Sequence, residues 1–113
     1  MLRCDLKSMI EQSDSLYQIK KNELHPGDTL ILKTLNSIYS ITMESDGKYT
    51  VSGGWFDKRN MSPVKTTISG CTWGGSVIKT DTVAACGLHL EFGNRLITSK
   101  INKIFVFPQN ISN

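Results

Sequence analysis

A thiol and an imidazole are the first groups in this sequence that could do chemistry together. Cys71 lies in the glycine-dense stretch SGCTWGGSVIKTD, residues 69–81, and His89 follows it in the second half of the chain. A nucleophilic thiol needs a base or a cation that lowers its pKa. No helix start is predicted beside Cys71, and its surroundings differ from those of cysteine proteases and nucleophile-elbow serines. We therefore expect no catalytic residue, and an enzyme that depends on Cys71 is the alternative function.

A metal site would use the same part of the chain, because Cys86 and His89 have the spacing of a ligand pair. This pair lies in an alternating stretch that predicts a strand, where positions three apart point to opposite faces. We therefore expect no metal site and no cofactor. Three cysteines, Cys4, Cys71 and Cys86, cannot all pair within one chain, and their spacing is not that of a secreted disulfide framework. The sequence thus predicts free thiols.

The glycines of residues 69–81 do not indicate a phosphate-binding loop. The Lys-Ser/Thr pair of a Walker motif is missing, and so is the helix that follows a dinucleotide fingerprint. Glycine inside a strand more often marks a positive φ or a close approach of two backbones. We predict a corner of the fold here, with Trp73 covering an apolar gap.

The stretch WFDKR, residues 55–59, interleaves aromatic and basic side chains. Such side chains stack on unpaired bases and neutralise phosphates, and Trp and Arg are equally frequent at the centres of protein interfaces. The alternative is that Trp55 and Phe56 fold inward and close one end of the fold. The sequence therefore favours a small non-catalytic binding or adaptor module whose partner is a protein or a single-stranded nucleic acid. The predicted contact residues are Trp55, Lys58, Arg59, Lys65 and Trp73.

The composition is that of one globular domain, with 113 residues of which 39% are hydrophobic and 20% charged. Residues 1–47 hold five Lys/Arg against seven Asp/Glu, and residues 48–113 hold eight against three. The basic second part suits a polyanion, although ordinary solvated surfaces carry as much charge. No apolar run is long enough to span a bilayer, and the first residues lack the apolar core of a signal peptide. We expect no membrane partner and a cytoplasmic location.

Turn signals separate a series of short apolar segments. Pro26-Gly27 fits a type II turn, and Asp46-Gly47 and Gly93-Asn94 fit hairpin turns. The segments between them alternate between apolar and polar residues, which indicates strands. The predicted strands are 29–35, 38–43, 48–52, 65–71, 83–92, 96–101 and 104–107. Residues 53–64 predict an exposed connection.

Six or seven short strands with little helix predict an all-β fold, namely a small antiparallel β-barrel with a compact β-sandwich as the alternative. Residues 24–107 form this domain and residues 108–113 a C-terminal tail. Residues 1–23 form an N-terminal segment that is either a short helix around 6–13 or extended around 15–19. The apolar parity slips near Asn102-Lys103, which predicts a bulge. The predicted core is Leu30, Leu32, Tyr39, Ile41, Val51, Ile68, Cys86, Leu88, Leu90, Phe92 and Ile101, with His89 and Glu91 facing outward.

Overall fold

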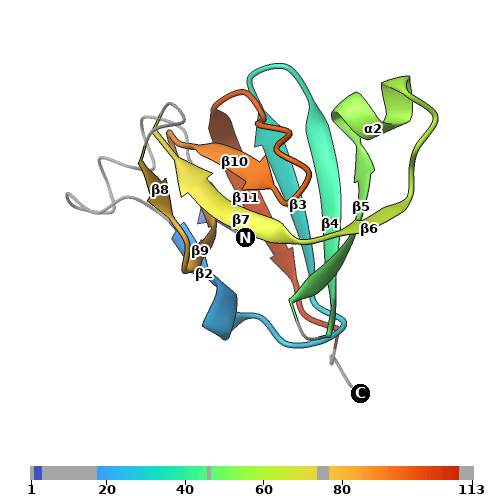
Figure 1. Cartoon of the computed structure of the whole chain (residues 1–113). Helices are drawn as coiled ribbons and strands as arrows, with labels where there is room; N and C mark the ends of the chain where they lie inside the picture. Colours follow the sequence, from blue (N-terminus) through green and yellow to red (C-terminus); the bar gives the residue numbers. More distant parts are fainter. Residues whose placement is uncertain (1, 4–17, 46, 74–76, 110–113) are drawn as a thin grey trace.

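A computed structural model describes residues 2–3, 18–45, 47–73 and 77–109 of the chain. Figure 1 shows a small fold that consists mainly of strands. The elements in chain order are β1 (Leu2–Arg3), β2 (Gln18–Lys20), the 3-10 helix η1 (Lys21–Glu23), β3 (Thr29–Thr34), β4 (Ile38–Ser45), β5 (Lys48–Gly53), α2 (Gly54–Lys58), β6 (Val64–Thr66), β7 (Ile68–Thr72), β8 (Ile78–Lys79), β9 (Thr82–Ala85), β10 (His89–Phe92) and β11 (Ile101–Phe107). Within these ranges, no helix is long and apolar enough to cross a membrane.

The strands form three antiparallel sheets. The largest has the order β1-β11-β3-β4-β5-β6, the second the order β10-β7-β8, and β2 pairs with β9. In Figure 1 the second sheet lies across the front of the largest one. The all-β class is therefore confirmed. No closed barrel is present among the described strands, and the layered arrangement fits the compact sandwich.

The centre of the largest sheet is a meander of β3, β4 and β5, as the turn signals predict. Gly27 has φ +95°, which suits the third residue of a type II turn, the position that requires a positive φ. Its N–H donates to the Met43 carbonyl oxygen at 2.7 Å. Gly47, with φ +78°, lies in the turn between β4 and β5. The apolar parity of these strands then places Leu30, Ile41 and Val51 opposite one another on the inner face.

One continuous segment joins the two larger sheets. β6 pairs with β5 in the largest sheet, and only Thr67 separates it from β7, which pairs with β10 in the second sheet. The predicted strand 65–71 is therefore two strands that belong to different sheets. Of the corner predicted for residues 69–81, the close backbone approach is confirmed at Gly70 within β7, where a Cβ atom would lie 2.2 Å from the Lys79 carbonyl oxygen. Gly74 and Gly75 lie outside the described residues.

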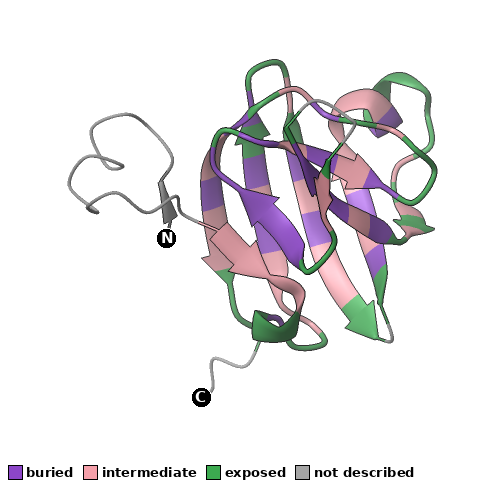
Figure 2. Ribbon diagram, turned by 60° about the vertical axis from the view of Figure 1, so that its left-hand side comes forward, coloured by how far each residue is buried: buried purple, intermediate pink, exposed green. Residues whose placement is uncertain are grey.

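All eleven residues predicted for the core are buried, and Figure 2 shows buried positions alternating along the strands of the largest sheet. The predicted core did not include Tyr49 and Ile104, which are also fully buried, and it gave an inward Phe56 only as an alternative. The predicted bulge is confirmed, because the pairing of β11 with β3 shifts between Ile101 and Lys103.

Two strand predictions in the C-terminal half are wrong. The stretch 83–92 is divided into β9 and β10 by a turn at Gly87, whose φ is +82° and whose N–H donates to the Ile101 carbonyl oxygen. Residues 96–100 form no strand apart from a single bridge between Glu91 and Ile97, and Ile101 is already the first residue of β11. His89 and Glu91, predicted to face outward, are half-buried. The same alternation predicts an outward Ala85, which is instead buried.

The N-terminal alternatives are tested in part. β2 overlaps the extended segment predicted around 15–19, and it pairs with β9 through Ile19 and Ala84. The helix predicted around 6–13 lies outside the described residues.

Leu90 and His89 are neighbours in β10 whose side chains point to opposite faces, and they provide a matched test of the core. Leu90 is fully buried, so Leu90→Ala should lower the free energy of unfolding by about 2–5 kcal/mol. His89 is half-buried and its Nδ1–H donates to the Thr98 carbonyl oxygen at 2.8 Å, so His89→Ala should cost only about 1 kcal/mol. Chemical denaturation measures both, and a larger loss in His89→Ala would contradict the assigned faces.

Candidate partner-binding site

The site begins with a glycine pair that brings a short helix onto the start of β4. The backbone of Gly53 has φ +100° and that of Gly54 has φ +47°. A Cβ atom at Gly53 would lie 2.2 Å from the Ile38 carbonyl oxygen, and one at Gly54 would lie 2.4 Å from Cζ of Tyr39. Only glycine allows both the conformation and the close approach. The segment predicted as an exposed connection thus begins with helix α2, packed against Tyr39.

Helix α2 contributes Phe56 to an aromatic cluster that joins the two larger sheets. Phe56 is fully buried, with its ring centroid 6.3 Å from Tyr39 of β4 and 5.2 Å from Phe92 of β10. The centroids of Tyr39 and Phe92 lie 5.9 Å apart. Edge-to-face and tilted contacts of this kind stabilise beyond the area that they bury. The helix is therefore fixed to the core by its own second aromatic residue.

Trp55 lies between this cluster and the surface. Its ring meets Phe56 edge to face at 5.4 Å, and its backbone N–H donates to the Tyr39 hydroxyl at 3.3 Å. The outer side of the ring is covered by Arg59, whose Cζ lies 5.0 Å from the ring centroid in a cation–π contact. The inward alternative is thus correct for Phe56 and half correct for Trp55, which remains partly exposed.

The charged residues of α2 are arranged so that the cations face outward. Oδ1 of Asp57 accepts a hydrogen bond from the Gly53 N–H at 3.1 Å, so this carboxylate helps to hold the start of the helix. Lys58 and Arg59 are exposed. Asp57 is exposed as well, so this part of the surface carries two cations and one carboxylate, and the carboxylate also holds the start of the helix.

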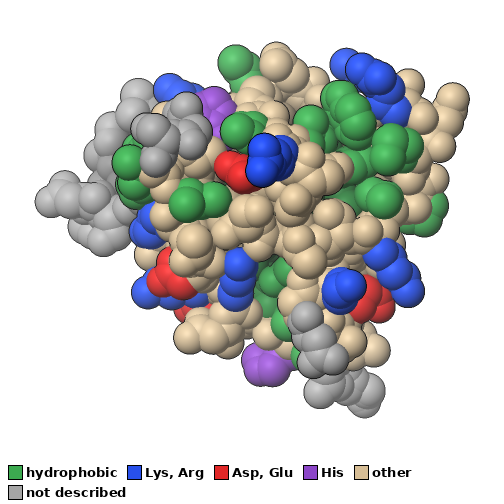
Figure 3. Space-filling view, in the orientation of Figure 1, with side chains coloured by type: hydrophobic (Ala, Val, Ile, Leu, Met, Phe, Trp, Pro, Cys, Tyr) green, Lys and Arg blue, Asp and Glu red, His purple; other side chains and the backbone are tan. Residues whose placement is uncertain are grey.

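Exposed aliphatic residues from other segments lie around α2. A hollow of about 190 Å³ lies between the helix, the β3–β4 turn and the loop before β11, and Trp55, Lys58 and Ile97 are among the residues that line it. Figure 3 shows hydrophobic side chains gathered where Figure 1 places α2, with basic side chains beside them. The large exposed hydrophobic residues of these segments are Leu35 (70% exposed), Ile38 (58%), Ile97 (44%) and Met61 (41%). We call Trp55, Lys58, Arg59, Ile97 and Ile38 the α2 surface.

Two predicted contact residues lie elsewhere. Lys65 is on β6, where it lines a different hollow, and Trp73 follows β7. Figure 1 shows β7 and β8 on the side of the molecule away from α2. Trp73 is 55% exposed, so the prediction that it covers an apolar gap is wrong. The structure therefore brings Trp55, Lys58 and Arg59 together and places Trp73 apart from them.

Cys71 is held in its protonated form. The side chain is buried, and burial raises the pKa of the thiol to about 12. The Sγ–H donates to the Val83 carbonyl oxygen at 3.5 Å. His89 lies on β10 beside Leu90, the cross-strand partner of Cys71, and its side chain points to the opposite face. The thiol and the imidazole predicted as an alternative pair are thus separated by the sheet.

Cys86 is disulfide-bonded, and the sulfur to which it is bonded lies outside the described residues. The prediction of three free thiols is therefore wrong at Cys86, while Cys71 is free. The prediction relied on the regular cysteine spacing of a disulfide framework, and a single disulfide among three cysteines does not produce such spacing. Across the described ranges, no three His, Cys, Asp or Glu side chains gather in a way that could hold a metal ion.

The aliphatic part of the α2 surface was missed from the sequence. Ile38 and Ile97 come from segments far from α2 in the chain, so no local pattern connects them with Trp55. The Gly53-Gly54 pair was the available signal, because two consecutive glycines before an aromatic pair allow a close approach.

The chain matches no family model, no curated protein and no solved structure.

Alkylation tests the state of Cys71. In the native protein at pH 7.5, iodoacetamide should leave Cys71 unmodified, because the thiol is buried and its pKa is raised to about 12. The same residue should react fully after denaturation, as peptide mass spectrometry would show. The raised pKa of Cys71 also contributes to the stability of the fold, in full at pH values below about 9, the pKa of the unfolded thiol. This contribution is lost as the pH rises from about 9 through about 12, the pKa of the thiol in the fold. Rapid native labelling of Cys71 would contradict the assignment.

Proposed function

We propose that this chain is a non-catalytic binding or adaptor module that contacts a protein partner through the α2 surface. The observation that carries the proposal is the position of Trp55, which is anchored by Phe56, covered by Arg59 and next to exposed Ile97. Trp and Arg dominate the binding energy of many protein interfaces, and surrounding aliphatic residues exclude water from them. Cations at the edge favour a partner segment that combines apolar side chains with carboxylates.

The geometry favours a protein over single-stranded nucleic acid. A base would stack on the open face of an aromatic ring, but the guanidinium of Arg59 lies over that ring of Trp55. The nearby exposed residues are aliphatic and offer no further stacking platform. Lys48 and Lys65 lie away from α2, in a hollow of their own. The exposed side chains of the helix segment include the Asp57 carboxylate beside Lys58 and Arg59, so it is not the purely cationic surface that a phosphate backbone favours.

Two further observations bear on the alternatives. An enzyme that depends on Cys71 would need an accessible thiolate, whereas this thiol is buried and protonated. A cytoplasmic location stays a prediction, and the disulfide at Cys86 counts against it because disulfides persist mainly in oxidising compartments.

Affinity capture with the full chain tests the proposal. Lysate and secreted fractions are passed over the immobilised protein, and the most enriched partner is then titrated against purified variants. Trp55→Ala and Arg59→Ala should each weaken binding by about 30-fold, as expected at an interface centre. The loss should persist at high salt, and nuclease treatment should change nothing.

Lys48→Gln is the matched control, because it removes an exposed lysine that lies away from the α2 surface. Lys48 is at the start of β5, whereas α2 follows the end of that strand. It should bind the partner as the unchanged protein does. Partners that disappear with nuclease would indicate nucleic acid instead. A Trp55→Ala variant that folds normally and keeps every partner would remove the α2 surface from the account.

A further inference from the structure

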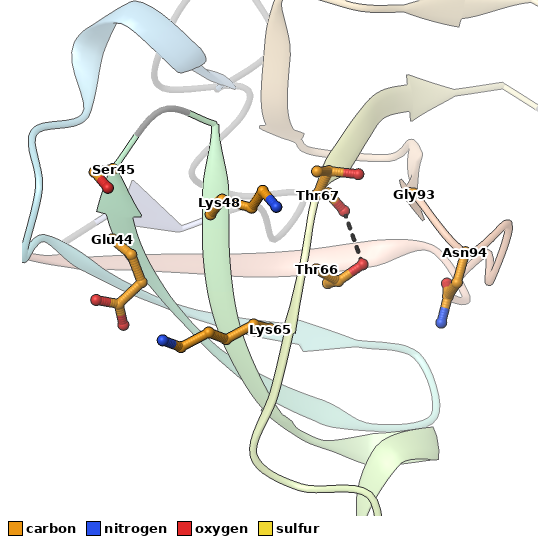
Figure 4. A pocket seen from close by; sticks show the side chains of 8 residues that line it. All are labelled: Glu44, Ser45, Lys48, Lys65, Thr66, Thr67, Gly93 and Asn94. Carbon is orange, nitrogen blue, oxygen red and sulfur yellow. Dashed lines mark hydrogen bonds between the residues drawn. The ribbon is translucent and has the colours of Figure 1, made fainter.

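A second hollow lies away from the α2 surface, between the end of the β4–β5 hairpin, β6 and the turn after β10. Its volume is about 590 Å³, which is within the range of small-molecule sites. Figure 4 shows the side chains that line it: Glu44, Ser45, Lys48, Lys65, Thr66, Thr67, Gly93 and Asn94. This hollow forms where β6 leaves the largest sheet and the chain continues as β7 in the second.

Every side chain in the lining carries a polar group, alongside the aliphatic stems of the two lysines and the glutamate. The lining offers hydroxyl, amide, ammonium and carboxylate groups, and none of the eight residues has an aromatic or purely aliphatic side chain. A planar base or an apolar ligand would find nothing to stack on, whereas a ligand rich in hydroxyl groups could form hydrogen bonds on all sides. The chemistry of the lining therefore points to a hydrophilic ligand.

Glycine and asparagine in the turn after β10 shape one wall. The N–H of Gly93 donates to the Thr67 carbonyl oxygen at 2.8 Å, and a Cβ atom at Gly93 would lie within 1.9 Å of the Thr67 Oγ1. The turn can approach β6 this closely only because residue 93 has no side chain. Oδ1 of Asn94 accepts the Leu96 N–H at 3.1 Å, so the Nδ2 group of Asn94 remains to donate to a ligand.

The charges are separated along the hollow. Figure 4 shows the Lys48 ammonium group pointing toward Thr67, and the Lys65 ammonium group pointing toward Glu44. Neither ammonium group is in an ion pair or hydrogen bond with a residue that the structure describes. Oε2 of Glu44 accepts the Thr50 hydroxyl at 2.7 Å, which fixes this carboxylate. One end thus presents a cation with hydroxyl and amide donors, and the other a carboxylate beside a second cation.

We propose that this hollow binds a small phosphorylated polyol, such as a sugar phosphate. Lys48 binds the phosphate group, assisted by the Thr67 hydroxyl and the Asn94 amide, because charge-assisted hydrogen bonds to phosphate are the strong ones. Glu44 accepts hydrogen bonds from the hydroxyl groups of the polyol, and Lys65 donates to them. The proposal does not depend on the α2 surface or on its partner.

Chemical-shift titration of the isotope-labelled full chain tests this site. Glucose 6-phosphate, inorganic phosphate and glucose are added separately at pH 7.5 and constant ionic strength. Glucose 6-phosphate should cause saturable shifts of the amides of Thr67, Gly93 and Asn94. Inorganic phosphate should bind the same amides at least tenfold more weakly, and glucose alone more weakly still. Equal affinity for glucose and glucose 6-phosphate would overturn the phosphate assignment.

Variants separate this site from general binding to surface lysines. Lys48→Gln should weaken binding of glucose 6-phosphate at least tenfold, and the isosteric Thr67→Val about threefold. Arg59→Gln, which removes an equally exposed cation from the α2 surface, should leave the affinity unchanged. Equal loss in Lys48→Gln and Arg59→Gln, or the absence of saturable shifts in the unchanged protein, would overturn the proposal.

Discussion

The close contact between Gly54 and the Tyr39 ring is the constraint on which the rest of this structure depends. Both glycines of the pair have positive φ, and neither position has room for a Cβ atom. The chain can therefore leave β5 and turn at once into α2, directly above Tyr39. Phe56 then packs against both Tyr39 and Phe92, so one residue from the helix reinforces the direct contact between β4 of the largest sheet and β10 of the second.

The same contact creates the surface that we assign to binding. Because Phe56 points into the core, its neighbour Trp55 is held at the rim, where Arg59 covers the ring. The acid of the helix, Asp57, accepts a hydrogen bond from the Gly53 N–H and stays exposed beside Lys58 and Arg59. An aromatic residue held in this way loses little conformational freedom on binding, which favours its use as an anchor in an interface. The core and the α2 surface thus depend on one another through adjacent residues.

The sequence predicted the parts of the fold that alternation and turn chemistry determine locally. Strands β3, β4 and β5, the glycine turns before β3 and between β4 and β5, and the bulge near Asn102 follow from patterns within a few residues. It could not predict the break at Gly87, because a turn there leaves the alternation of Val83–Phe92 intact in the sequence. Helix α2 is too short to show a helical period. The aliphatic neighbours of Trp55 come from distant segments, and only the tertiary fold brings them near.

A comparison of Gly54→Ala with Gly47→Ala tests the central claim most directly. Both positions have positive φ and carry the same strain for alanine, about 1 kcal/mol, but a Cβ atom meets Tyr39 at residue 54 and nothing within 4 Å at residue 47. Thermal unfolding should show that Gly54→Ala loses clearly more stability than Gly47→Ala. Partner capture should show that Gly54→Ala no longer binds the partner, whereas Gly47→Ala still does. Equal stability of the two variants, with the partner retained by both, would contradict the account.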